Sequence, residues 1–179
     1  MQSNRLDLNI ISRVRRNHGL EHATINLLSK KLPAVSFYGR SDAKGFWING
    51  NVSTDLLLET VQEALKRLKG GEKGLAVHEN CGTNVVTAGV IAGTLAWLGS
   101  LGKANNFKKK LDRWGWLVML VTGGLILAQP LGPKVQEHVT TSGDPGDLAV
   151  KQIVRYEGRV ITMHRILTAD ERPAVEPAA

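Results

Sequence analysis

The N-terminal part of the chain has the apolar periodicity of an amphipathic helix. From Leu8 to Lys31 the apolar residues recur at helical spacing, and one stripe of the helix carries Ile11, Val14, Ile25 and Leu28. Lys30 and Lys31 end the segment, where their positive charge interacts favourably with the negative end of the helix dipole. The pattern therefore predicts a first helix that ends before Pro33.

The following stretch changes to a pattern typical of strands. Aromatic and β-branched residues at 35–40 and 46–48 flank a polar, glycine-containing turn at 41–45, which predicts a β-hairpin. Ser53 is the expected N-cap of a second helix that stops at Gly70 and Gly71. The short apolar run 74–77 predicts a third strand. Residues 1–83 are thus expected to form a small α+β unit.

Two later stretches, Val85–Leu101 and Trp114–Leu131, are apolar on all sides and uncharged. Each is close to the lower limit of about 17 residues for a membrane-spanning helix. The segment between them is basic and contains Lys103, Lys108, Lys109, Lys110 and Arg113. We therefore expect residues 84–132 to form a two-helix membrane hairpin. The alternative is a helical hairpin buried in a soluble core.

The orientation of such a hairpin is left open by the charge pattern. The first residues lack the apolar core of a signal peptide, so we expect the N-terminal unit to lie in the cytoplasm. The basic connecting segment then conflicts with the positive-inside rule, although four basic residues at 66–73 offset it. A hairpin that enters the membrane without crossing it would also remove the conflict.

The C-terminal part becomes polar after Pro133. Residues 133–170 are expected to form a short interfacial helix at 134–141 and a β-hairpin between 148 and 167, while the proline-containing tail 171–179 is expected to be disordered. His138 and His164 are predicted to be surface or half-buried residues. The fold class predicted for the whole chain is α+β, with a cytoplasmic unit, a membrane hairpin and a β-hairpin tail.

The net charge and the cysteine count of the chain limit the classes of function that it can have. The chain has 179 residues, 42% hydrophobic residues and a net charge of +7, which suits one domain with a membrane part. The charge fits either nucleic acid or an anionic membrane surface, but only Phe107 interleaves with the lysines, so nucleic acid is the disfavoured partner. The single cysteine excludes an intramolecular disulfide and is compatible with metal binding.

Candidate chemistry lies in two short clusters. His18, Glu21 and His22 form the inverted zinc motif H-x-x-E-H, in which the histidines bind metal and the glutamate acts as a base. A buried histidine pair hydrogen-bonded to the glutamate is the alternative interpretation. His78 and Cys81 have metal-ligand spacing and include the only thiol, which favours the metal interpretation.

These clusters resemble a known family. The segments 18–22 and 78–83 resemble the H-G-A-E-H-K and H-P-R-C-G-T signatures of the YqhQ-like family of bacterial membrane proteins, which are regarded as metal-dependent enzymes. Two apolar spans follow the second signature here as they do there. Departures are Ala23, where the family has lysine, and Glu79-Asn80, where it has Pro-Arg. The likeness covers about residues 15–25 and 77–150, and it implies a neighbouring family with a metal site.

The resulting hypothesis is a membrane-associated zinc-dependent hydrolase, with a peptide as candidate substrate. His18 and His22 would bind the metal, together with His78, Cys81 or both, and Glu21 would be the general base if a coordination position stays open. Four protein ligands would instead make a closed structural site in a non-catalytic membrane-complex subunit. Expected partners are membrane lipid and a peptide substrate or another membrane protein. Three asparagines are candidate hydrogen-bond donors to an oxyanion or caps: Asn17, Asn80 and Asn84.

Overall fold

The computed structural model describes residues 2–101, 106–158 and 161–171, and for residues 2–8 and 107 it describes the backbone only. Most of the segment predicted to be a disordered tail thus lies outside the described residues. The chain divides into two compact units. Unit 1 comprises residues 1–78 and 139–179, and unit 2 comprises residues 79–138.

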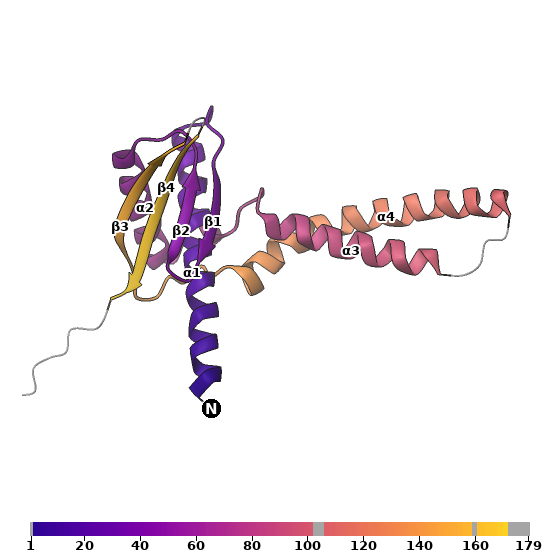
Figure 1. Ribbon diagram of the computed structural model, residues 1–179, viewed down its shortest axis with the longest axis horizontal. Coiled ribbons are helices and arrows are strands. Elements are labelled where there is room, and N and C mark those ends of the chain that lie inside the picture. Colours follow the sequence, from indigo (N-terminus) through magenta and orange to yellow (C-terminus); the bar gives the residue numbers. More distant parts are fainter. Residues whose placement is uncertain (1, 102–105, 159–160, 172–179) are drawn as a thin grey trace, which may run out of the picture. The chain divides into compact units, whose positions relative to one another are not determined.

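Unit 1 is built on a four-stranded antiparallel sheet in the order β1-β2-β4-β3 (Figure 1). The strands are β1 (Tyr38–Asp42), β2 (Gly45–Asn49), β3 (Leu148–Glu157) and β4 (Thr162–Asp170). This confirms the α+β class. The C-terminal β-hairpin was expected as a separate tail, but β4 pairs with β2, with Ile166 opposite Phe46. Both side chains are fully buried, because the pairing places them on the same covered face.

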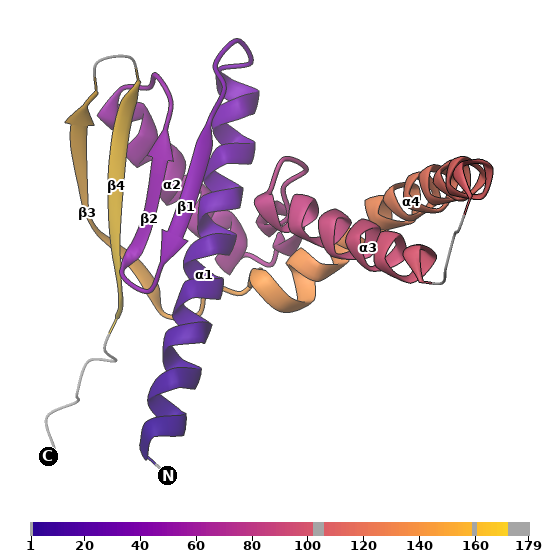
Figure 2. The same ribbon diagram turned by 45° about the vertical axis from the view of Figure 1, so that its right-hand side comes forward.

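Two helices cover one face of this sheet (Figure 2). They are α1 (Gln2–Lys31) and α2 (Thr54–Lys69). As predicted, Ser53 caps α2 by accepting a hydrogen bond from the Leu56 backbone, and Gly70 follows its last turn. The core between helices and sheet contains Leu20, Leu28, Phe46, Ile48, Leu57, Val61, Leu148 and Ile166, all fully buried.

The predicted third strand at 74–77 is wrong. The segment instead contains a single 3₁₀ turn, η1 (Lys73–Ala76), followed by extended backbone at Val77. Its carbonyl oxygens accept hydrogen bonds from side chains of α1, so they do not take part in a strand ladder. A short apolar run cannot by itself distinguish these two ways of satisfying its backbone.

Unit 2 is a helical hairpin of α3 (Gly82–Ser100) and α4 (Phe107–Val135). The helices approach closely where a glycine faces a leucine: a Cβ atom on Gly124 would lie 2.3 Å from Leu95 Cδ1. The segment 134–141 is largely helical, as predicted, but it is not a separate helix, because α4 passes through Pro130 and Pro133 and continues as a π-helical segment, η2 (Gln136–Thr140). A wider π turn accommodates the backbone groups that proline leaves without intrahelical partners.

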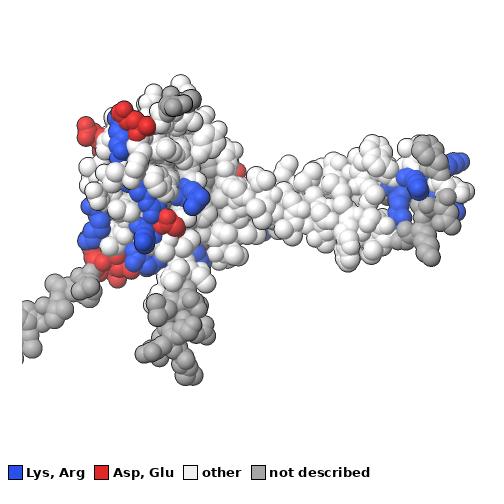
Figure 3. Space-filling view, in the orientation of Figure 1, with Lys and Arg blue, Asp and Glu red and all other residues white. Residues whose placement is uncertain are grey.

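The apolar surface of this hairpin is exposed. Both helices are long and apolar enough to cross a membrane by length and composition, and the apolar windows are 0% and 17% buried. Within the described part of the chain, no residue of α3 is buried, which differs from the alternative of a hairpin inside a soluble core. In the view of Figure 3, uncharged residues cover the hairpin up to its far end, where basic residues lie.

Candidate metal centre

The candidate centre of unit 1 is built on one face of α1. His18, His22 and Asn26 are four residues apart, so their side chains follow one another along the same side of the helix. The ring centroids of His18 and His22 are 4.3 Å apart. His22 is 2% exposed and His18 is half-buried.

Both imidazoles are fixed by hydrogen bonds at the same ring nitrogen. His18 Nδ1 donates to the Thr140 carbonyl oxygen at 2.9 Å, and His22 Nδ1 donates to the Ala76 carbonyl oxygen at 2.8 Å. A carbonyl oxygen can only accept, so Nδ1 carries a proton in each ring, and in the neutral form of the ring Nε2 carries the lone pair. Histidines that bind metal commonly have this arrangement, in which a backbone carbonyl orients the ring through its other nitrogen.

Residues 75–77, which we call the strap, hold His78 near this pair. The Asn26 side-chain amide donates to the carbonyl oxygens of Leu75 and Val77 at 3.0 and 2.9 Å, and His22 binds the carbonyl between them. Three consecutive carbonyl groups are thus bound by α1. His78 follows directly, with its ring centroid 5.7 Å from that of His22. Asn26 was not identified from the sequence, although its spacing from His18 and His22 was a signal that could have identified it.

A second segment crosses α1 at the glycine of the first motif. A Cβ atom on Gly19 would lie 2.0 Å from the Ser142 carbonyl oxygen, so only glycine allows this approach. The guanidinium group of Arg15 donates to the Thr141 carbonyl oxygen at 3.0 and 3.2 Å. Residues 140–142 are thereby fixed against the helix, which also positions the carbonyl group that orients His18.

Glu21 faces a different element from its neighbour His22. Its carboxylate accepts a hydrogen bond from the Ser41 hydroxyl on β1 and lies against Gly39, where a Cβ atom would be only 2.2 Å from Oε1. The side chain is 3% exposed. Ser41 and Gly39 therefore define the position of this carboxylate, and neither residue was singled out from the sequence.

The candidate asparagines have structural contacts. Asn17 is fully buried and joins α1 to two strands, because its amide donates to the Asp42 carbonyl oxygen at 2.8 Å and its oxygen accepts from the Thr168 hydroxyl at 2.7 Å. In unit 2, Asn84 donates to the Glu79 carbonyl oxygen at 2.6 Å and accepts from Gln136 at 2.5 Å. Asn80 is exposed.

Cys81 belongs to unit 2, where it is the N-cap of α3 and its sulfur accepts a hydrogen bond from the Thr83 backbone at 3.4 Å. It is 6% exposed and follows His78 by three positions in the chain. His18 and His22 each offer an imidazole nitrogen, and Cys81 offers a thiol sulfur, as candidate donor atoms for a metal ion. Imidazole nitrogen and thiolate are the donors that suit Zn²⁺.

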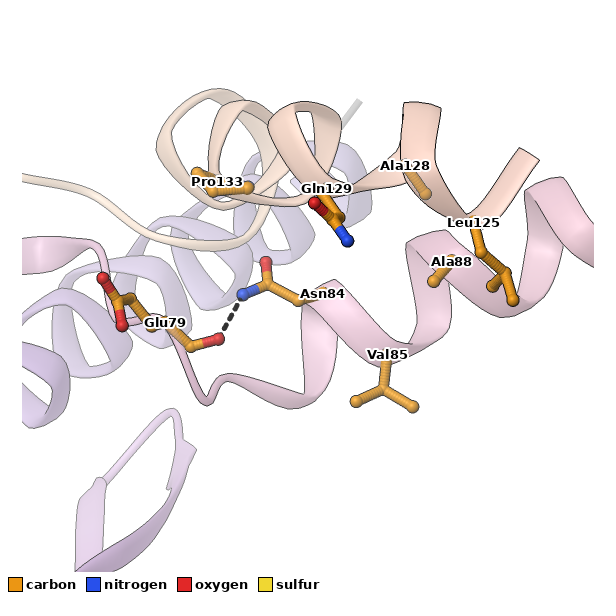
Figure 4. A pocket seen from close by; sticks show the side chains of 8 residues that line it. All are labelled: Glu79, Asn84, Val85, Ala88, Leu125, Ala128, Gln129 and Pro133. Atoms are coloured by element: carbon orange, nitrogen blue, oxygen red, sulfur yellow. Dashed lines mark hydrogen bonds between the residues drawn. The ribbon is translucent and has the colours of Figure 1, made fainter. Parts of the chain in front are cut away.

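A pocket of about 380 Å³ lies within unit 2 (Figure 4). Apolar side chains from α3 and α4 form most of its wall, and polar groups occur toward the base of the hairpin. The residues that line it are Glu79, Asn84, Val85, Ala88, Leu125, Ala128, Gln129 and Pro133. This chemistry suits an apolar group with one hydrogen-bonding end.

The fold and these side chains define a class of protein: an α+β unit with a histidine pair of metal-ligand type, interrupted by an apolar helical hairpin. Residues 13–153 match the family described as a domain of unknown function, DUF6391, and the chain belongs to this family. The match includes both histidine-containing motifs and the hairpin. The likeness of the motifs to the YqhQ-like family stays a prediction.

An uncharacterized protein of the cyanobacterium Picosynechococcus sp. is similar to this chain. The two are 32% identical over 154 residues, which cover 78% of this chain and 71% of that relative. No solved structure matches the chain.

Proposed function

We propose that the chain is a membrane-anchored metalloprotein that binds one zinc-like ion through His18 and His22, with His78, Cys81 or both as further ligands. The observation that carries this proposal is the matched pair of Nδ1 hydrogen bonds, to Thr140 and Ala76. These bonds leave the Nε2 lone pair as the donor on both rings, as a metal site requires.

The reaction that these residues support best is hydrolysis, with a peptide as the candidate substrate. Zinc with an open coordination position activates a water molecule by lowering its pKa to about 7. Glu21 would accept the proton of that water as general base, and Ser41 would hold the carboxylate in place. Glu21 precedes His22 directly, as the glutamate does in the inverted zinc motif.

A second candidate function is a closed structural site in a non-catalytic membrane subunit. Burial favours it, because His22 is 2% exposed and Cys81 is 6% exposed, which leaves little surface for a substrate. In this case all four ligands bind the metal, and Glu21 supports the ligand shell without taking part in a reaction.

The hairpin of α3 and α4 would anchor the protein in the bacterial cytoplasmic membrane. Its exposed apolar residues form one continuous group along both helices, whereas a soluble protein normally exposes such residues singly. Unit 1 would then face the cytoplasm, where lipid and a peptide or membrane-protein partner are the expected contacts.

Metal content tests the proposal. Full-length protein purified in detergent without chelator should contain about one zinc-like ion per chain by elemental analysis. His18→Ala, His22→Ala and Cys81→Ser should each reduce occupancy. His138→Ala is the matched control, because His138 is exposed on η2 and its Nδ1 donates to the Lys134 carbonyl oxygen one turn earlier. A metal-free wild-type protein would exclude the proposed centre.

A further inference from the structure

The turn end of the helical hairpin gathers most of the chain's tryptophans. Because the end of α3 packs against the start of α4, with Gly99 against Leu117, Trp97 lies at the same end of unit 2 as Trp114 and Trp116. These three of the chain's four tryptophans are 63%, 65% and 75% exposed. Exposed tryptophans at one level of an apolar hairpin are typical of a membrane–water interface.

Three lysines lie just beyond this tryptophan level. Lys108, Lys109 and Lys110 occupy the first turn of α4 and are exposed, and we call them the cationic tip (Figure 3). Among the described residues no ion pair involves them. The first turn contains no acidic residue, and the N-cap Asn106 makes no side-chain capping bond. Positive charge therefore adds to the positive end of the helix dipole.

The neighbouring Arg113 has a separate, structural contact. Its guanidinium group donates to the Gly99 carbonyl oxygen at 3.2 Å and to the Leu101 carbonyl oxygen. These bonds satisfy backbone acceptors at the C-terminal end of α3. Arg113 thus links the start of α4 to the end of α3, and the three lysines take no part in these bonds.

We infer that the cationic tip binds the anionic headgroups of membrane phospholipids, with the tryptophans at the boundary of the hydrocarbon layer. The inference rests on the proposed membrane placement of the hairpin. Lysines next to a membrane-spanning helix attract anionic lipid electrostatically. Nucleic acid fits less well, because residues 82–101 and 114–133 contain no charged side chain and offer a phosphate chain no further cation.

The test uses the full-length protein in lipid nanodiscs. One preparation contains phosphatidylcholine alone, and another contains phosphatidylcholine with one quarter phosphatidylglycerol. Native mass spectrometry then counts the lipids that stay bound to the protein. The wild type should retain phosphatidylglycerol in preference to phosphatidylcholine. The triple variant K108Q/K109Q/K110Q should lose this preference by about tenfold or more, because each lysine near an anionic surface contributes to the attraction.

The matched control is K30Q/K44Q/K66Q, which removes the same charge from exposed lysines of unit 1. It should keep the wild-type preference. Equal retention of the two lipids by the wild type, or equal loss in both triple variants, would overturn the inference. Binding of a single-stranded RNA oligonucleotide that only the tip variant loses, without lipid preference, would also overturn it.

Membrane extraction separates failure of the inference from failure of the proposed anchor. If wild-type protein stays in the membrane pellet after alkaline washing but shows no phosphatidylglycerol preference, only the inference about the cationic tip is overturned. Protein recovered as a soluble monomer without detergent overturns both.

Discussion

The pair Glu21 and His22 shows how adjacent residues of one helix serve different neighbours. His22 binds the backbone of η1, whereas Glu21 accepts from Ser41 on β1. The H-x-x-E-H pattern identified these residues from sequence because its spacing is local. The partners Ser41 and Ala76 were not identified, because only the tertiary fold brings β1 and η1 to α1.

Glu21→Gln tests the role of this carboxylate. The amide keeps the shape and can still accept a hydrogen bond from Ser41, but it cannot take a proton at neutral pH. If Glu21 is a general base, the variant should retain its metal and lose about 10²–10⁴-fold in the rate of peptide hydrolysis. The measurements are metal content and cleavage of a peptide library. A variant that loses about 10–100-fold in metal affinity would show a structural role instead.

His164 predicts a pH dependence of stability. It was expected at the surface or half-buried, but it is fully buried beneath α2, where its Nε2 is 3.2 Å from the Thr54 hydroxyl oxygen. Burial, and secondarily the positive charge of Arg155, lowers the pKa of His164 below its ordinary value of 6.5. The unfolded chain therefore binds this proton more readily than the folded one. Stability is fully present above pH 6.5 and falls as the pH is lowered through that value.

Thermal melting of the metal-stripped protein in detergent measures this effect. Between pH 7.5 and pH 5.5 the stability of wild type should fall by up to about 1.4 kcal/mol per pH unit from this one group. His164→Gln cannot titrate and should melt with a smaller pH dependence. The same slope in both proteins would assign the effect to other groups.

At the level of elements, the strap of η1 on α1 delivers His78. The sequence predicted the helices and both β-hairpins, because their periodicity and turn residues are local signals. It did not predict η1, since the run 74–77 is apolar and short, and its conformation depends on Asn26 and His22. The pairing of β4 with β2 was not predicted either. The two strands are separated by 110 or more residues, and neither strand contains a sequence signal for its register with the other.

Asn26→Leu tests the strap. Leucine has similar size but cannot donate to the carbonyl oxygens of Leu75 and Val77, so the segment that carries His78 should lose its fixed position. If His78 is a ligand, zinc affinity should fall by about 10–100-fold, as for other residues that orient a ligand. Competition with a zinc chelator measures the affinity. Asn49→Leu is a control, since Asn49 lies on β2 and its side chain donates to the Tyr38 carbonyl oxygen. Similar losses in both variants would indicate a general effect on folding.

At the level of the whole molecule, the hairpin is predicted to cross the membrane. α3 has 19 residues, and at about 1.5 Å per residue it is nearly as long as a hydrocarbon layer of about 30 Å is thick. Cysteines introduced at Asn106 in unit 2 and at Lys44 in unit 1 should react with an impermeant maleimide from opposite sides. Labelling from the same side would show that the hairpin enters the membrane without crossing it. Wild-type protein is the background control, since Cys81 is buried.

The division of unit 1 into two chain segments has a consequence for the order of events during synthesis. The first segment ends at His78, and the second begins at Val139. A ribosome therefore completes the whole hairpin before it produces β3 and β4. Until then β2 is an open edge on the side that β4 will occupy, and the carbonyl group of Thr140 that orients His18 has not been made. Synthesis of the hairpin thus precedes completion of the candidate centre. On the proposed membrane placement, a chain whose hairpin fails to insert would expose both an unpaired strand and an unfinished site to proteolysis.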